Sequence, residues 1–162
     1  MIEGDTPPDP SAVPLPETAN PPLLRTDFTD DEAWSALRDE VGDGCVTFVA
    51  DPVHRGLPAR QLVGSRHPVL LVADEVTFSN DDRTLLVVDL VEEPGQAFRI
   101  VPDAVRSVVG NLVIQNMYFS DFRGSVDDAG VYRLSPKYHQ ALAELRSVNQ
   151  APTTIAIPGP RQ

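Results

Sequence analysis

The sequence of 162 residues has one cysteine and no long apolar run, and each scarcity excludes a class of protein. A single thiol, Cys45, cannot form an internal disulfide. It stands at the start of a predicted strand with no histidine near it in sequence, so we expect it to be buried and unreactive. No apolar stretch approaches the roughly 20 residues that a membrane-spanning helix needs. The first residues are acidic and rich in proline, unlike a secretory signal, so we expect a cytoplasmic protein.

Basic residues are also scarce. Thirteen Lys and Arg stand against 24 Asp and Glu, which gives a formal net charge of −11 at pH 7. Proteins that bind nucleic acids or anionic membranes draw much of their affinity from Lys and Arg. The composition therefore argues against both partners, and it favours a protein partner with a basic surface.

Proline is concentrated near the start of the chain, which predicts where the folded part begins. Residues 1–22 contain seven prolines and four acids with little to bury, as is typical of a disordered leader. Residues 149–162 repeat this pattern on a smaller scale and are predicted to form a flexible tail. The length suits one domain, which we place at residues 23–148.

Within this domain the order of elements predicts an α/β fold with a mixed sheet, in two or three layers. Thr29 and Glu32 match the S/T-x-x-E capping box, and apolar residues recur after them at helical spacing. Strands on both sides of this helix favour parallel pairing through helical crossovers. Later, "TLLVVDLVEEPGQAFRIVP" predicts a β-hairpin around Pro94 and Gly95, with type II geometry.

The remaining segments are assigned by their start and stop signals. "EVTF" at residues 75–78 is predicted to extend a strand or begin a new one. A helix starts at Pro102 and stops at Gly110, and "FSDFRGSV" forms a short helix. "SPKYHQALAELRSVN", residues 135–149, is predicted to be a final helix because a serine and a proline begin it.

Four apolar strands of the sequence run into an aspartate. These residues are Asp27, Asp51, Asp74 and Asp89. If the strands are parallel, their carboxyl ends meet at one end of the sheet, where α/β proteins build sites. Mg²⁺ and Ca²⁺ bind several carboxylate oxygens, so the four residues are candidates for a divalent-metal site. We favour the alternative that residues such as Asp51 and Asp74 accept backbone N–H groups and start turns, and we predict no cofactor.

Asp89 differs from the other three because Leu90 and Val91 continue the apolar run beyond it. It is therefore predicted to lie within a strand. A buried carboxylate without a partner costs several kcal/mol, so it requires an arginine, backbone donors or an ion. A two-residue hairpin loop would place Asp89 opposite Ile100, whereas one more loop residue would bring Arg99 beside it. We favour an ion pair between Asp89 and Arg99.

Other chemical motifs are few. The sequence has neither the G-x-S-x-G motif of hydrolases nor C-x-x-C. His54, His67 and His139 have no metal-ligand spacing, and the first two are predicted to be solvated loop residues.

Three phrases of the sequence stand in an order that is specific enough to suggest a family. They are "LLRTDFTDDEAWSAL", "LLVVDLVEEPGQAFRIVP" and "NLVIQNMYFSDF". Together, over residues 23–133, they resemble a family of small uncharacterised domains found mainly in actinobacteria. The resemblance implies no activity, cofactor or catalytic residue, and the proline-rich leader and the final helix depart from it.

These observations leave two main hypotheses about function and a third, minor one. The first is a non-catalytic acidic domain that binds a basic protein, as immunity proteins and antitoxins do, with a contiguous negative patch and no deep pocket. The second is a divalent-metal-dependent enzyme, using Mg or Ca, in which at least three of the four aspartates converge in a cleft. The third is an accessory domain that is recruited through residues 1–22.

Overall fold

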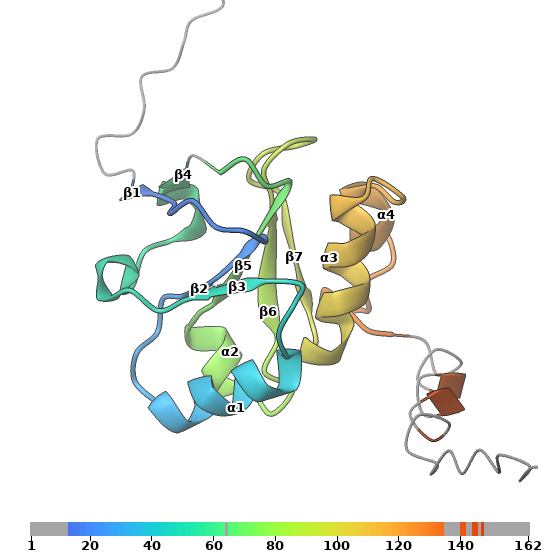
Figure 1. Cartoon of the computed structure of the whole chain (residues 1–162), viewed down its shortest axis with the longest axis horizontal. Helices are drawn as coiled ribbons and strands as arrows, with labels where there is room; N and C mark the ends of the chain where they lie inside the picture. Colours follow the sequence, from blue (N-terminus) through green and yellow to red (C-terminus); the bar gives the residue numbers. More distant parts are fainter. Residues whose placement is uncertain (1–12, 64, 135–139, 142–143, 146, 148–162) are drawn as a thin grey trace, which may run out of the picture.

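One six-stranded sheet forms the centre of the protein, in a computed structural model that describes residues 13–63, 65–134, 140–141, 144–145 and 147 (Figure 1). In their order across the sheet, the strands are β3 (Thr47–Val49), β2 (Pro22–Arg25), β5 (Val69–Ala73), β6 (Leu85–Asp89), β7 (Ala97–Ile100) and β8 (Val131–Tyr132). Strand β2 is parallel to β3 and β5, β6 is antiparallel to β5 and β7, and β8 is parallel to β7. The predicted α/β class, the parallel early strands and the later hairpin are confirmed.

The strand directions give the sheet two different ends. Five strands end on one side, which we call the carboxyl end, and α2 (Glu75–Ser79) begins there directly after β5. Only β6 runs the other way among the six, so it ends beside the loop that joins it to β7, at what we call the hairpin end (Figure 1).

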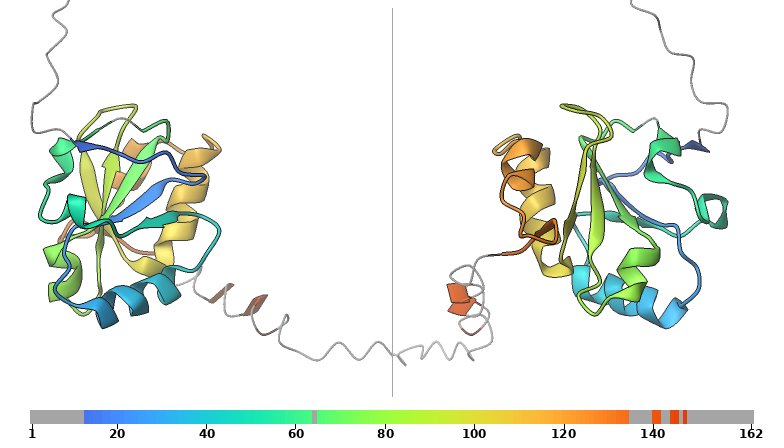
Figure 2. Two further views of the ribbon diagram at one scale, coloured as in Figure 1. Left: turned by 60° about the vertical axis from the view of Figure 1, so that its left-hand side comes forward. Right: turned by 180° about the vertical axis from the view of Figure 1, so that it is seen from behind.

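Three helices contribute to the core on one face of the sheet (Figure 2). They are α1 (Asp31–Val41), α3 (Val105–Val113), which follows the short 3-10 turn η3 (Pro102–Ala104), and α4 (Phe119–Arg123). Helix α1 buries Trp34, Leu37 and Val41, which recur at helical spacing as the sequence predicts. Leu71 and Val87 of the sheet lie in the same core.

The other face of the sheet is covered by irregular chain rather than by helices. A two-stranded pair, β1 (Val13–Pro14) with β4 (Leu62–Val63), lies there with the 3-10 turns η1 (Pro52–His54) and η2 (Ala59–Gln61). Leu15 is buried against sheet residues such as Leu70 on this side. The prediction of a disordered leader is therefore wrong for residues 13–22, because pairing with β4 and burial of Leu15 hold them in the fold. Residues 1–12 and the tail at 149–162 lie outside the described part.

Local capping groups explain where the helices differ from the predicted ones. "EVTF" is helical, not a strand, because the Asp74 side chain accepts a hydrogen bond from the Thr77 N–H. Helix α1 is capped by Asp30 rather than Thr29, whose hydroxyl donates to Asp27 instead. Helix α3 continues past Gly110, while the predicted short helix at α4 is confirmed.

Two further findings concern the predicted final helix and the length of the helices. Of the predicted final helix, only residues 140–141, 144–145 and 147 are described, and these are helical. In the part of the chain that the structure describes, no helix has the length and apolar character that a bilayer crossing requires.

The β6–β7 hairpin fixes the position of Asp89 relative to Arg99. The Gln96 N–H donates to the Glu93 carbonyl, and Gly95 has a φ of 93°, as the predicted type II turn requires. The Asp89 N–H donates to the Gln96 carbonyl, so six residues separate the paired positions. Arg99 consequently pairs with Leu86, near the far end of β6 from Asp89.

Candidate functional site

A cavity of about 550 Å³ opens at the carboxyl end of the sheet, on the face that has no helical cover. We call it the carboxyl-end pocket. It is lined by residues 26–29 after β2, residues 55–59 between η1 and η2, and residues 74–76 at the start of α2, with Val72 and Leu86 from the sheet. A site outside the carboxyl ends of parallel strands is the usual arrangement in α/β proteins.

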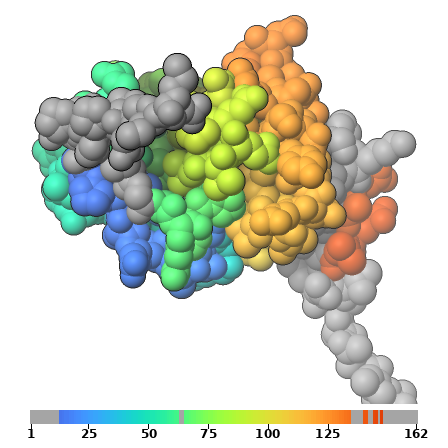
Figure 3. Space-filling model, turned by 90° about the horizontal axis from the view of Figure 1, so that it is seen from above, coloured from blue at the N-terminus to red at the C-terminus, as the bar shows by residue number. Residues whose placement is uncertain are grey.

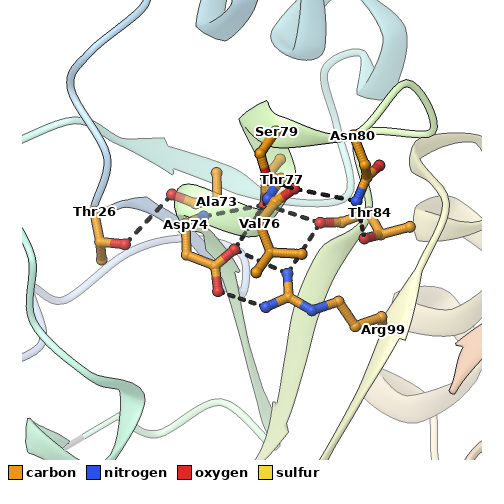
Figure 4. Close-up of polar contacts among 9 residues, drawn as sticks. All are labelled: Thr26, Ala73, Asp74, Val76, Thr77, Ser79, Asn80, Thr84 and Arg99. Carbon is orange, nitrogen blue, oxygen red and sulfur yellow. Dashed lines mark hydrogen bonds and ion pairs between the residues drawn. The ribbon is translucent and has the colours of Figure 1, made fainter. Parts of the chain in front are cut away.

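Asp74 is held in this pocket by a bidentate ion pair with Arg99 (Figure 4). The distances are 2.9 Å from Nη1 to Oδ1 and 2.6 Å from Nη2 to Oδ2, and Nη1 also donates to the Thr84 carbonyl at 3.2 Å. The Thr77 backbone N–H and hydroxyl donate to Oδ1 as well. Both oxygens of Asp74 are therefore engaged within the protein.

This environment lowers the pKa of the Asp74 carboxyl below its ordinary value. Burial alone would raise the pKa, since the side chain is only 25% exposed, but the hydrogen bonds and charge of Arg99 and the hydrogen bonds of Thr77 outweigh it. Asp74 is thus ionised at neutral pH, and its charge is neutralised by Arg99.

Two other carboxylates of the pocket lack such a partner. The Asp27 Oδ1 accepts from the Thr29 N–H at 2.8 Å and from its hydroxyl at 2.6 Å, which starts the turn before α1. Glu75 is exposed in the first turn of α2. Among the described residues, no basic side chain lies within ion-pair distance of either carboxylate. Their negative charges face the pocket without neutralisation.

An aromatic ring forms part of the pocket wall. Phe28 is half-buried, and the guanidinium carbons of Arg25 and Arg55 lie 4.6 and 5.2 Å from its ring centroid. Arg55, the basic residue that lines the pocket, is thereby engaged with the ring. Leu57 and Pro58 add apolar surface beside it. The pocket therefore combines apolar walls with a net negative lining.

The four strand-end aspartates do not lie at one site. Asp27 and Asp74 line the carboxyl-end pocket, whereas Asp51 lies outside its lining and accepts from the Val53 N–H at 3.0 Å, starting η1. The turn-starting interpretation is confirmed for Asp51 and Asp74. Among the described residues, no three His, Cys, Asp or Glu side chains are grouped so as to hold a metal ion.

Asp89 lies at the hairpin end, because β6 is antiparallel to β5. Its side chain accepts from the backbone N–H groups of Val91, Glu92 and Glu93 at 3.0, 3.2 and 2.7 Å. The predicted ion pair between Asp89 and Arg99 is wrong, since Arg99 binds Asp74. Backbone donors, which the sequence left as an alternative, satisfy this buried carboxylate.

Glu75 lines the pocket but was not among the predicted site residues, although the sequence contains a signal for its position. Asp74-Glu75 followed by Thr77 is the pattern of a helix start, which places Glu75 at the pocket. The prediction that His54 is solvated is wrong, because its side chain is buried. Cys45 is half-buried, and burial raises the pKa of its thiol, so the thiol is protonated at neutral pH.

The fold and the pocket define a class: a small mixed α/β domain with an open, negatively lined pocket at the carboxyl end of its sheet. The chain belongs to the family described as "Domain of unknown function (DUF6924)", whose model matches residues 20–135. The match includes all six strands of the main sheet and leaves out β1. No curated protein matches the sequence.

Proposed function

We propose that this protein is a non-catalytic acidic domain that binds a basic protein partner, as immunity proteins and antitoxins do. In this proposal the carboxyl-end pocket receives a Lys or Arg side chain of the partner. The net charge of −11 favours association with a basic surface and disfavours most others. We further expect the protein to act in the cytoplasm.

The observation that carries the proposal is the different state of the three carboxylates in the pocket. Asp74 is neutralised and fixed by Arg99, whereas Asp27 and Glu75 have no basic partner in the described chain. An arriving cation would meet an Asp27 carboxylate that Thr29 already holds, beside a Glu75 whose backbone is fixed at a helix start. Little reorganisation would then oppose binding.

The shape of the pocket suits a long basic side chain. Lys and Arg carry an aliphatic stem that packs on apolar surface while the charged group reaches a polar partner. Phe28, Leu57 and Val72 offer such surface in the same pocket lining as the carboxylates. The interaction hypothesis had predicted no deep pocket, and this open cavity modifies it: we expect a side chain of the partner to enter.

The metal-dependent enzyme gains no comparable support. Of its candidates, only Asp27 and Asp74 share the pocket, and both oxygens of Asp74 already bind Arg99. A hard cation would have to compete there with the charge and hydrogen bonds of that arginine.

The test uses acetyl-arginine amide and its citrulline analogue, which has nearly the same shape without the charge. Titrated into the ¹⁵N-labelled protein, the arginine compound should shift the amide signals of residues 26–29 and 74–76 saturably, with a dissociation constant of about 1 mM. Glu75→Gln and Asp27→Asn should weaken the response. Asp128→Asn, an exposed change outside the pocket lining, should not. An equal response to citrulline, or shifts elsewhere only, would contradict the proposal.

A further inference from the structure

A second, smaller cavity of about 260 Å³ lies at the hairpin end, on the helical face of the sheet. We call it the hairpin-end pocket. Its apolar lining comes from Pro68, Val91, Leu112, Met117 and Phe119, with part of Tyr118. Figure 3 views this end and shows the β6–β7 loop, in yellow-green, beside the α3–α4 segment, in orange. Two chain segments that are distant in the sequence thus build one pocket.

Two apolar side chains that line this pocket, Val91 and Tyr118, are 64% and 67% exposed. Val113 and Ile114, which stand in the chain between the lining residues Leu112 and Gln115, are exposed as well. Single exposed apolar residues are ordinary on a protein surface. A group of them around a cavity is what interaction sites show, since a bound partner would remove them from water.

The backbone around the pocket is fixed before any partner arrives. The Asp89 carboxylate binds three successive N–H groups of the loop that carries Val91 and Glu92. The Glu92 Oε1 in turn accepts from the Phe119 N–H at 3.4 Å, which joins the loop to α4. A preformed surface loses little conformational entropy on binding, so its apolar contacts contribute more of their energy to affinity.

The charge at the rim favours one kind of occupant. Glu92 lines the pocket and brings a negative charge to its rim, whereas the neighbouring Glu93, 66% exposed, pairs with Arg123 at 3.5 Å. In a symmetric dimer of this chain through the hairpin-end pocket, the two Glu92 carboxylates would approach each other, which costs energy. A segment with a basic residue next to an apolar one complements both features.

We propose that the hairpin-end pocket is a docking site for a basic, amphipathic segment of a protein partner. One large apolar side chain of the segment fills the pocket, and a neighbouring Lys or Arg binds Glu92. The inference rests on the proposed function only in taking the partner to be a basic protein. It concerns a different surface, at the opposite end of the sheet from the carboxyl-end pocket.

A displayed library of random 12-residue peptides, selected on the full-length protein at physiological salt, tests this site. The test variant is Val91→Asp, in the lining of the hairpin-end pocket. Its matched control is Val53→Asp, which changes another exposed valine, on η1. Selected peptides should share a Leu, Ile, Met or Phe within one turn of a Lys or Arg. Val91→Asp should weaken their binding at least tenfold and Val53→Asp less than twofold. Thermal unfolding would confirm that both variants fold.

Three outcomes would overturn the proposal: no peptide that distinguishes the two variants, enrichment of acidic peptides, or a wild-type dimer in sedimentation that Val91→Asp dissociates. The last result would assign the hairpin-end pocket to a second copy of the chain. Failure of this site is distinguishable from failure of the carboxyl-end pocket. Glu75→Gln should leave the selected peptides bound, and Val91→Asp should leave the response to acetyl-arginine amide intact.

Discussion

The two ends of the sheet hold a strand-end aspartate in different ways. At the carboxyl end, Asp74 is 25% exposed and pairs with a guanidinium group. At the hairpin end, Asp89 is 2% exposed and binds three backbone N–H groups, and no arginine of the described part of the chain pairs with it. A buried carboxylate in this fold therefore requires hydrogen-bond donors rather than an opposite charge, because directed hydrogen bonds replace its lost hydration.

The pockets at the two ends of the sheet differ in the charge and polarity of their linings. The carboxyl-end pocket carries the charges of Asp27 and Glu75, which have no basic partner among the described residues, whereas the hairpin-end pocket is mainly apolar with Glu92 at its rim. Charged contacts chiefly provide specificity and fast association, while buried apolar anchors provide most of the affinity. A basic partner that contacts both ends would therefore derive selectivity from one and strength from the other.

The largest expected effect is at Asp89. Asp89→Ala leaves three loop N–H groups without an acceptor and should lower the free energy of unfolding by about 3 kcal/mol. Urea unfolding followed by circular dichroism measures this. Asp51→Ala is the matched control, since Asp51 is exposed and accepts one backbone bond, and it should cost about 0.5 kcal/mol. Equal costs at the two positions would show that the buried donors have found other partners.

Asp74→Asn should lower the free energy of unfolding by about 1 kcal/mol at pH 7, less than Asp89→Ala, because the ion pair with Arg99 is partly solvated. The pKa of Asp74 is lowered in the folded protein, so its contribution is fully present above the unfolded value near 3.8. That contribution is lost as the pH falls through the folded pKa. The stability difference between wild type and variant should therefore shrink below pH 3.8, as urea unfolding at several pH values would measure.

The control for this pH dependence is Asp128→Asn, an exposed change with no ion pair in the described chain. Its stability difference from wild type should stay near zero at every pH. A difference at Asp74 that grows as the pH falls would contradict the assigned direction of the pKa.

Much of the fold was predictable because its signals are local. The apolar spacing of α1 and the Pro94-Gly95 turn each act within a few residues, and the cap of α1 lies at Asp30, one residue from the predicted Thr29. The pairing of β1 with β4 could not be predicted, since two short strands about fifty residues apart leave no periodic pattern in the sequence. The leader was consequently predicted to be disordered, although part of it packs on the sheet.

The candidate site was less predictable than the fold. That an aspartate after a strand starts a turn is a local rule, and it holds for Asp51 and Asp74. Which aspartates share an end of the sheet depends on strand direction, and β6 takes Asp89 to the other end. The pairing of Arg99 with Asp74 depends on a hairpin register that the loop length sets. Such long-range geometry is not encoded in any short motif.

Gly95→Ala tests the hairpin-end loop itself. Gly95 has a φ of 93°, a conformation that L-residues with a Cβ rarely adopt, while a Cβ there would meet no neighbouring atom. The substitution should therefore lower the free energy of unfolding by about 1 kcal/mol through backbone strain alone. Gly124→Ala, where φ is negative and a carbonyl oxygen would lie 3.2 Å from the Cβ, separates strain from crowding. An unchanged free energy of unfolding in Gly95→Ala would mean that the loop relaxes to another conformation.

The smallest expected effect compares one strained residue from each end. Arg83, just before β6 at the carboxyl end, and Gln115, beside the hairpin-end pocket, have φ values of 49° and 57°. Replacing either residue by glycine removes the strain of the left-handed conformation but increases the freedom of the unfolded chain. The free energy of unfolding should therefore rise by only about 0.5 kcal/mol. Arg83→Gly also loses an ion pair with Glu40 at 3.5 Å, so thermal unfolding should show less gain there than for Gln115→Gly. Destabilisation by Gln115→Gly would mean that its side chain, not only its backbone, supports the pocket wall.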